Sequence, residues 1–324
     1  MGGAGAGQFC QTKHCYQKDL KAAIMLPAIY ISHGSPMLAL EPGPSGAAFD
    51  ALGQVLRARK PRAVLVVSAH WIYSTLVVGT RERQEAWHDF GGFPRALYEL
   101  RYDAAGSPAL AARVKALVEA AQVPGAAVVL QDDERPLDHG AWMPMRHLFP
   151  DADIPVVQLA LNPYLPPAAQ IEIGRALAPL RDEGVLVLGS GSFTHNLQEV
   201  FGAGGLREQH GSPVEPYVEA FRGWMIQALD DALATGDTTR IADYRAQAPY
   251  ARRAHPADEH LLPFFVALGA ALGPHEGVPA EQAPAGVARV ARVADEVTYG
   301  VLAMDTFVFE GAGTHPAPAW SEAA

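Results

Sequence analysis

The chain alternates short apolar runs with longer segments in which apolar residues recur every three or four positions. Continuous apolar runs of this kind are typical of strands in a parallel sheet that helices cover on both faces. The runs that predict strands are residues 28–32, 63–68, 128–130, 156–161 and 185–189. The segments 108–121 and 168–181 have the apolar spacing of surface helices. This alternation predicts an α/β fold.

The rest of the pattern predicts one domain with a mostly parallel central sheet and a helical C-terminal portion. Residues 213–272 are mainly helical in pattern, and the apolar run 301–309 predicts a final strand at the sheet edge. The ends of the chain lack apolar periodicity, which predicts a disordered extension over 1–25 and a disordered tail over 311–324. The predicted folded domain is therefore 26–310.

Composition and charge narrow the function. Of the 324 residues, 49% are apolar and 19% charged, which excludes a disordered or fibrous protein. The formal charge of −10 and the lack of a basic block argue against binding to nucleic acid or to an anionic membrane. Without an apolar stretch long enough to span a bilayer, we expect a cytoplasmic protein that acts on a small molecule.

Cysteine and histidine usage indicates the kind of site. The two cysteines, Cys10 and Cys15, lie near the start of the chain, so a metal site in the body must use His and carboxylates. Three of the twelve histidines follow a predicted strand: His33 in AIYISHGSP, His70 in AVLVVSAHW and His195 in VLVLGSGSFTHN. Each alone is most simply a core or turn histidine. Together they predict a site, because ligands of open α/β sheets bind at the carboxyl ends of the strands.

A fourth histidine, His260 in EHLLP, stands at the start of a predicted buried helix, and the neighbouring His255 is a weaker candidate. Two or three neutral imidazoles without cysteine suit Fe(II), Mn(II) or Zn(II). A histidine that is not a ligand is a natural acid/base because its ordinary pKa is about 6.5. The spacing leaves open which histidine has which role.

Two Gly-containing segments are further candidates for the site. HDFGGFP, residues 88–94, is either an aromatic wall of a pocket or a turn with packed Phe residues. LDHGAWMPM, which contains Asp138 and His139, is either part of a site or a helix start. The GSGS run at 189–192 lacks the spacing and the Lys of a phosphate loop, which argues against a nucleotide-binding enzyme.

The ordered set SHGSP, SAHW, HDFGGFP, LDHGAW, GSGSFTHN and EHLLP, spread over residues 26–309, resembles the DOPA-dioxygenase type of class III extradiol ring-cleaving dioxygenases. The resemblance implies a divalent metal held by His33, His70 and His260, with His195 as the acid/base. It also implies a further role at the site for His139, as a residue that contacts the substrate or supports the ligands. The expected cofactor is Fe(II), with Zn(II) as the alternative.

The same resemblance implies that the domain 26–310 is catalytic and that its substrates are a small aromatic diol and O₂. The aromatic residues that we expect around the substrate ring are Trp71, Phe90, Phe93 and Trp142. The oligomeric state, a homo-oligomer included, and the role of residues 202–212 stay open.

Three alternatives remain at this point. Glu259 adjoins His260, so a carboxylate is available as third ligand, as in two-His-one-carboxylate sites. The same histidines would also suit a zinc-dependent hydrolase. A non-catalytic metal- or ligand-binding homologue is the third alternative.

Overall fold

The computed structural model describes residues 25–202, 208–273 and 287–311. The predicted extension and tail therefore lie outside the described residues, except for Met25 and Gly311, and so does the middle of the 202–212 segment.

The described strands are β1 (Ala28–Ser32), β2 (Ala63–Ile72), β3 (Leu76–Gly79), β4 (Val129–Asp132), β5 (Val156–Leu161), β6 (Val185–Gly191), β7 (Val287–Ala294), β8 (Val297–Thr298), β9 (Leu302–Ala303) and β10 (Thr306–Gly311). The longer helices are α1 (Gly43–Ala58), α3 (Pro108–Ala121), α4 (His139–Leu148), α5 (Pro167–Leu177), α8 (Pro216–Thr235) and α12 (Leu262–Leu272). The short ones are η1 (Pro36–Ala39), α2 (Arg95–Tyr98), α6 (Pro179–Asp182), α7 (Leu197–Val200), α9 (Thr239–Ala242), α10 (Tyr244–Gln247) and α11 (Ala251–Ala254).

One mixed sheet forms the centre of the molecule, with the strand order β4-β3-β5-β2-β6-β1-β10-β7. The four central strands β5, β2, β6 and β1 are parallel, whereas β3 pairs with β5, and β10 with both of its neighbours, in antiparallel fashion. The predicted α/β class and mostly parallel centre are confirmed.

The end of the chain differs from the prediction in one respect. The run 301–309 contributes to β9 and β10, and β10 lies between β1 and β7 rather than at the sheet edge. The edge strand is β7, with the sequence VARVARVA. Because Arg289 and Arg292 interrupt its apolar residues in a Val-Ala-Arg repeat, it lacks the continuous apolar run of a buried strand and was not predicted.

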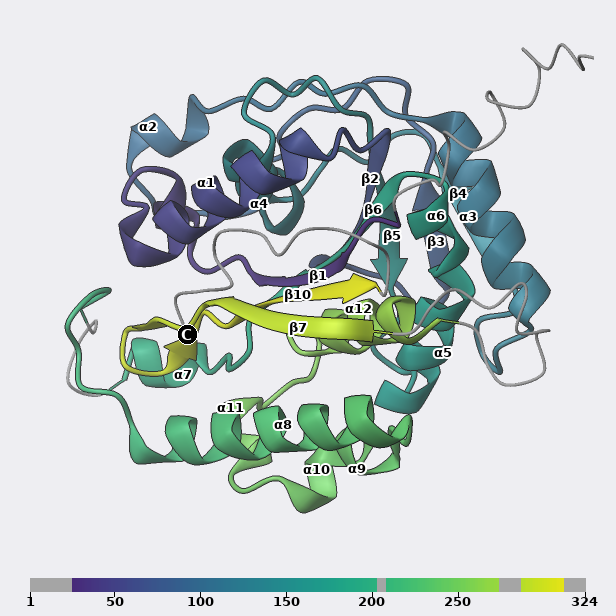
Figure 1. The fold of residues 1–324 in the computed structure, drawn as a ribbon. Helices are drawn as coiled ribbons and strands as arrows, with labels where there is room; N and C mark the ends of the chain where they lie inside the picture. The colour runs from purple at the N-terminus through teal and green to yellow at the C-terminus, as the bar shows by residue number, and fades with distance from the viewer. Residues whose placement is uncertain (1–24, 203–207, 274–286, 312–324) are drawn as a thin grey trace, which may run out of the picture.

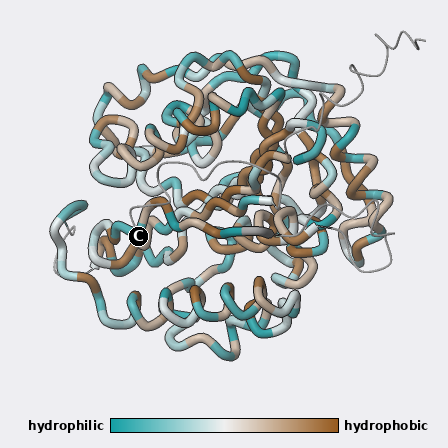
Figure 2. Tube along the Cα trace, viewed as in Figure 1, coloured by the Kyte–Doolittle hydropathy of each residue, from teal (hydrophilic) through white to brown (hydrophobic). Residues whose placement is uncertain are grey.

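Side chains of the central strands alternate between two cores, one on each face of the sheet. On β1, Ile29 and Ile31 pack with residues of α1 and α4, whereas Ala28 and Tyr30 pack with residues of α5, α8 and α12. Figure 1 shows α1 and α4 on one side of the sheet and α8 to α11 on the other. Apolar residues are concentrated along the central strands in Figure 2. None of the described helices is long and apolar enough to cross a membrane.

The carboxyl ends of three parallel strands lie level with one another. Ser32 on β1 pairs with Gly191 on β6, and Ser68 on β2 pairs with Ser190. Beyond this level β2 no longer pairs with β6, and its register with β5 shifts between Val67 and Ile72. The strand therefore leaves the regular sheet at the point where His70 occurs.

Candidate metal centre

Three imidazoles converge at the carboxyl ends of the strands through their Nε2 atoms. His33 directly follows β1, and His70 lies in the irregular last part of β2. The Nε2 atom of His70 lies 3.0 Å from that of His33 and 3.3 Å from that of His260. Residues that are far apart along the chain thus present the same ring atom to one point.

His260 reaches this point because the turn before α12 packs against β6. Its carbonyl oxygen accepts hydrogen bonds from the Ser192 amide at 2.9 Å and from the Tyr30 hydroxyl at 3.2 Å. A Cβ atom on Gly191 would lie 1.9 Å from the same oxygen, so this close approach requires glycine. The turn is therefore anchored to the sheet by its backbone.

The opposite ring nitrogen of each imidazole faces a polar partner. The Nδ1 atom of His33 lies 3.0 Å from Ser190 Oγ, and that of His260 lies 3.0 Å from Glu259 Oε1. The Nδ1 atom of His70 is 3.8 Å from Asp89 Oδ2, an ion-pair distance. Such partners fix the orientation of an imidazole and leave its Nε2 free to bind a metal.

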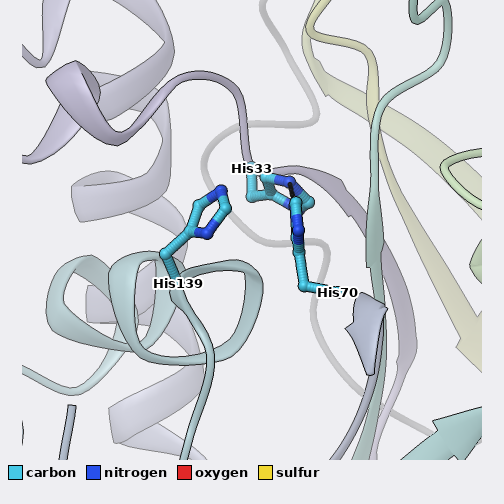
Figure 3. Close-up of side chains that lie close together, drawn as sticks. All are labelled: His33, His70 and His139. Carbon is cyan, nitrogen blue, oxygen red and sulfur yellow. Dashed lines mark hydrogen bonds between the residues drawn. The ribbon is translucent and has the colours of Figure 1, made fainter. Parts of the chain in front are cut away.

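His139 and His195 flank the three rings. Figure 3 shows His139 at the start of α4, opposite His33 and His70, and the centroids of the His139 and His70 rings are 3.9 Å apart. The ring of His195, from the turn after β6, stacks on His260 with centroids 3.5 Å apart and planes at 9°. All five predicted histidines therefore meet at one place.

Two groups of three residues have donor atoms within 4.8 Å of one another: His33, His70 and His139, and His195, Glu259 and His260. The contact between the Nε2 atoms of His70 and His260 joins the two groups. We favour His33, His70 and His260 as a ligand set because the Nε2 atoms of His33 and His260 both contact the Nε2 atom of His70. His139 and His195 then lie on either side of it.

The chemistry of these donors fits a divalent metal. Nitrogen ligands that bind one cation at about 2.1 Å lie roughly 3.0 to 3.4 Å apart, and the Nε2 atoms of His33 and His260 lie at such distances from that of His70. Imidazole ligands must also be neutral. Burial, followed by the charges of the neighbouring imidazoles, holds the pKa values of His33 and His260 well below 6.5 and lowers the pKa of His70 to about 3.

The His195 ring is also surrounded by buried groups and imidazoles, but its nitrogens have no hydrogen-bond partner among the described residues. Burial and the charge of His139 lower its pKa to about 4, so it is neutral near pH 7. A neutral imidazole without a partner can accept a proton from a ligand.

The four predicted aromatic residues occupy two different environments. Phe90 is partly buried. Its ring centroid lies 5.5 Å from that of His139 and 5.3 Å from that of Phe93. Trp71 and Trp142 are only 4% and 0% exposed and offer little surface to a ligand. The Trp142 indole donates to the Trp87 carbonyl oxygen at 2.9 Å, which fixes it beneath the loop that carries Phe90.

The sequence-based prediction missed two residues of the centre, Asp89 and Ser190. Asp89 accepts hydrogen bonds from His139 at both Nδ1 and the backbone amide, and Ser190 contacts His33. Burial raises the pKa of Asp89, but the hydrogen bonds and charge of His139 outweigh it and lower that pKa. Both lie inside motifs that were singled out, HDFGGFP and GSGSFTHN, which was the available signal.

Comparisons with known proteins identify a family and several relatives of this chain. A family described as the catalytic LigB subunit of aromatic ring-opening dioxygenase matches residues 27–291. A Beta vulgaris protein named 4,5-DOPA dioxygenase extradiol is 39% identical over 248 residues, or 75% of this chain and 85% of that protein. An Escherichia coli (strain K12) protein of the same name is 37% identical over 257 residues, or 78% and 88%.

A solved structure agrees with these sequence matches. The crystal structure of an uncharacterized protein from Escherichia coli K12 has a TM-score of 0.66 and 30% sequence identity. The similarity covers 88% of this chain and 99% of that one. The similarity therefore extends over most of the fold.

Proposed function

Because the chain belongs to the DOPA-dioxygenase type of the LigB family of aromatic ring-opening dioxygenases, we propose that it opens the ring of a catechol with O₂ at the histidine centre. The observation that carries the proposal is the convergence of three Nε2 atoms at the carboxyl ends of the strands. Cleavage would occur between a hydroxylated carbon and its unsubstituted neighbour. Both oxygen atoms would enter the product, a yellow semialdehyde.

In this proposal His33, His70 and His260 hold the metal. Fe(II) is the preferred ion, since three neutral imidazoles without a thiolate leave positions for substrate and O₂ and suit oxygen chemistry. When bound there, Fe(II) would bring the catechol oxygens and O₂ together and allow electron density to pass between them. Ser190 and Glu259 would keep the His33 and His260 rings in place through their Nδ1 atoms.

His195 is the proposed acid/base. Its ring is stacked on His260, partly exposed and neutral near pH 7, which supports proton uptake from the second catechol hydroxyl. It would return the proton as the ring opens. General acid/base catalysis of this kind contributes about 10² to 10⁴-fold to a rate.

His139 is the proposed contact to the substrate oxygens on the opposite side. Phe90 and Phe93 lie on that side and would pack against the aromatic ring, where edge contacts between rings are favourable. Trp142, which is fully buried and has its ring centroid 6.4 Å from that of Phe90, would support this wall from behind. Trp71 packs with Val77 and Ala160 instead.

The experiment is anaerobic reconstitution with Fe(II), followed by oxygen-electrode and visible-absorbance assays with substituted catechols. DOPA is the first substrate to test, because the Beta vulgaris and Escherichia coli relatives are named for it. The proposal predicts one O₂ consumed per catechol and a yellow product. Absence of O₂ uptake with every catechol would refute it.

A zinc-dependent hydrolase is the second candidate, because three histidines are also a ligand set of catalytic zinc. If Zn(II) were held there by these histidines, it would supply an activated water for hydrolysis, and O₂ would not be required. Ester hydrolysis by Zn(II)-reconstituted protein under anaerobic conditions, with no O₂ uptake by the Fe(II) form, would favour this candidate. If neither form turns over a substrate but the metal stays bound, the protein is a non-catalytic metal-binding homologue.

A further inference from the structure

Asp89 is a carboxylate that contacts His139 and also faces His70 at the centre. Its Oδ1 atom accepts from His139 Nδ1 at 2.9 Å and from the His139 backbone amide at 3.0 Å. Its Oδ2 atom lies 3.8 Å from His70 Nδ1. The Asp89 side chain is 9% exposed, so these contacts are sheltered from water.

The start of α4 explains why a carboxylate is held there. His139 is the first residue of the helix, and the amide at that position has no acceptor within the helix. The N-cap Asp138 accepts from the Ala141 amide, which leaves the amide of His139 to Asp89. A negative charge at a helix N-terminus is stabilised by the helix dipole, so the backbone helps to keep Asp89 in place.

Neighbouring rings restrict His139 further. The Phe90 ring meets it edge-on with centroids 5.5 Å apart, and the His70 ring lies 3.9 Å away on another side. Because Asp89 and Phe90 are consecutive, one short loop segment both packs against the imidazole and bonds to it.

We propose that Asp89 is a positioning residue that fixes one tautomer of His139. An ionised carboxylate only accepts hydrogen bonds, so whenever the His139 ring carries a single proton, that proton is on Nδ1. The Nε2 atom of His139 then carries a lone pair and can accept a hydrogen bond from a substrate hydroxyl. The consequence for substrate rests on the proposed function, whereas the tautomer does not.

The same helix supplies a matched control. His147, in the last turn of α4, has its Nδ1 atom 2.8 Å from Asp50 Oδ1. The two histidines are eight positions apart, which is about 12 Å along a helix. Asp50 has 59% of its side chain exposed and lies outside the histidine centre. Asp50→Asn therefore breaks a His–Asp pair of similar geometry without altering the site.

The first measurement is the ¹⁵N NMR spectrum of histidine-labelled, metal-free protein at pH 7.5, which distinguishes the two tautomers. In the wild type we expect His139 to carry its proton on Nδ1, and in Asp89→Asn a substantial population with the proton on Nε2. Asp50→Asn should leave His139 unchanged. A wild-type His139 protonated on Nε2 would overturn the proposal even if every variant failed to fold.

The second measurement is the split between kcat and KM in the Fe(II)-reconstituted enzyme. Outer partners of ligand histidines typically change activity about 10 to 100-fold, and we expect a loss of that size in kcat for Asp89→Asn with KM within about twofold of wild type. Asp50→Asn should retain full turnover. Equal turnover of both variants would contradict the inference, and if wild type itself lacks turnover, the NMR result still decides it separately from the proposed function.

Discussion

The two ends of the central sheet use buried polar groups in opposite ways. At the carboxyl ends, His33, His70 and His260 direct ring nitrogens at one another. At the other end, Arg181 is fully buried and donates to four backbone carbonyl oxygens: Leu26 at 2.7 Å, Ala270 at 3.0 Å, Ala271 at 3.1 Å and Phe309 at 3.4 Å.

The difference shows which end is built for stability. The carbonyls of Ala270 and Ala271 are at the C-terminal end of α12, where acceptors lack intrahelical donors, and Arg181 supplies them. Burial lowers the pKa of Arg181 to about 10, so it keeps its charge near pH 7. The histidines, in contrast, are neutral donors and acceptors grouped for a ligand. Substitutions at one end should therefore affect folding, and those at the other should affect function.

The largest expected effect follows from replacing a proposed ligand. His260→Ala should abolish metal retention and turnover, because one of three Nε2 donors is lost. Metal analysis of the purified variant after reconstitution is the measurement. Glu259→Gln is the control and should keep its metal, since its contact is to Nδ1. The reverse outcome would make Glu259 the ligand.

Replacing His195 should affect turnover without affecting the metal. In His195→Ala we expect kcat to fall about 10² to 10⁴-fold, the range for loss of general acid/base catalysis. Metal content should equal that of wild type, because His195 lies outside the preferred ligand set. A variant that cleaves catechols at the wild-type rate would refute the role of His195.

At the opposite end, Arg181→Met should reduce the free energy of unfolding by about 3 to 5 kcal/mol, because several buried carbonyl oxygens lose their donor. Urea denaturation measures this. Turnover per folded molecule should stay unchanged. A loss of turnover without a loss of stability would contradict the assignment of Arg181 to stability and of the histidine end to function.

The sequence predicted the histidines at the carboxyl ends of the strands, but it did not predict the buried Arg181 at the opposite end of the sheet. Buried parallel strands leave continuous apolar runs, and the residues after them must meet at one edge of the sheet, so the histidines could be found. Arg181 was predicted on a surface helix, 168–181. In the structure α5 ends at Leu177, and Arg181 lies in the separate short helix α6, where its side chain is fully buried.

Asp89 and β10 could not be predicted for a related reason. Asp89 is 50 residues from His139 in the chain, and no local pattern indicates that its loop packs against α4. The position of β10 inside the sheet depends on its pairing with β7, whose Val-Ala-Arg repeat matches neither the continuous apolar run nor the alternation typical of a strand. Both depend on contacts between distant segments.

The smallest expected effect near neutral pH is a pH dependence of folding, which grows as the pH falls. His255 is fully buried, and burial lowers its pKa to about 3 despite its hydrogen bond to the Phe193 carbonyl oxygen. The unfolded chain takes up this proton below about 6.5, and the folded chain does so only near 3. The metal-free protein should therefore lose stability as the pH falls from 6.5 towards 3.

Urea denaturation at a series of pH values measures this effect. His255→Gln should show a shallower decline, because one buried imidazole is removed, while Arg181→Met should keep the wild-type slope. If the free energy of unfolding falls equally steeply with pH in wild type and in His255→Gln, His255 does not contribute to the acid sensitivity of folding.

The most direct test of the central claim is the position of the metal. Anomalous diffraction at the iron edge, from crystals of the anaerobically reconstituted protein, locates the ion independently of any assay. The account predicts one peak within bonding distance of the Nε2 atoms of His33, His70 and His260. A peak elsewhere in the protein, or none in crystals that contain iron by chemical analysis, would contradict it.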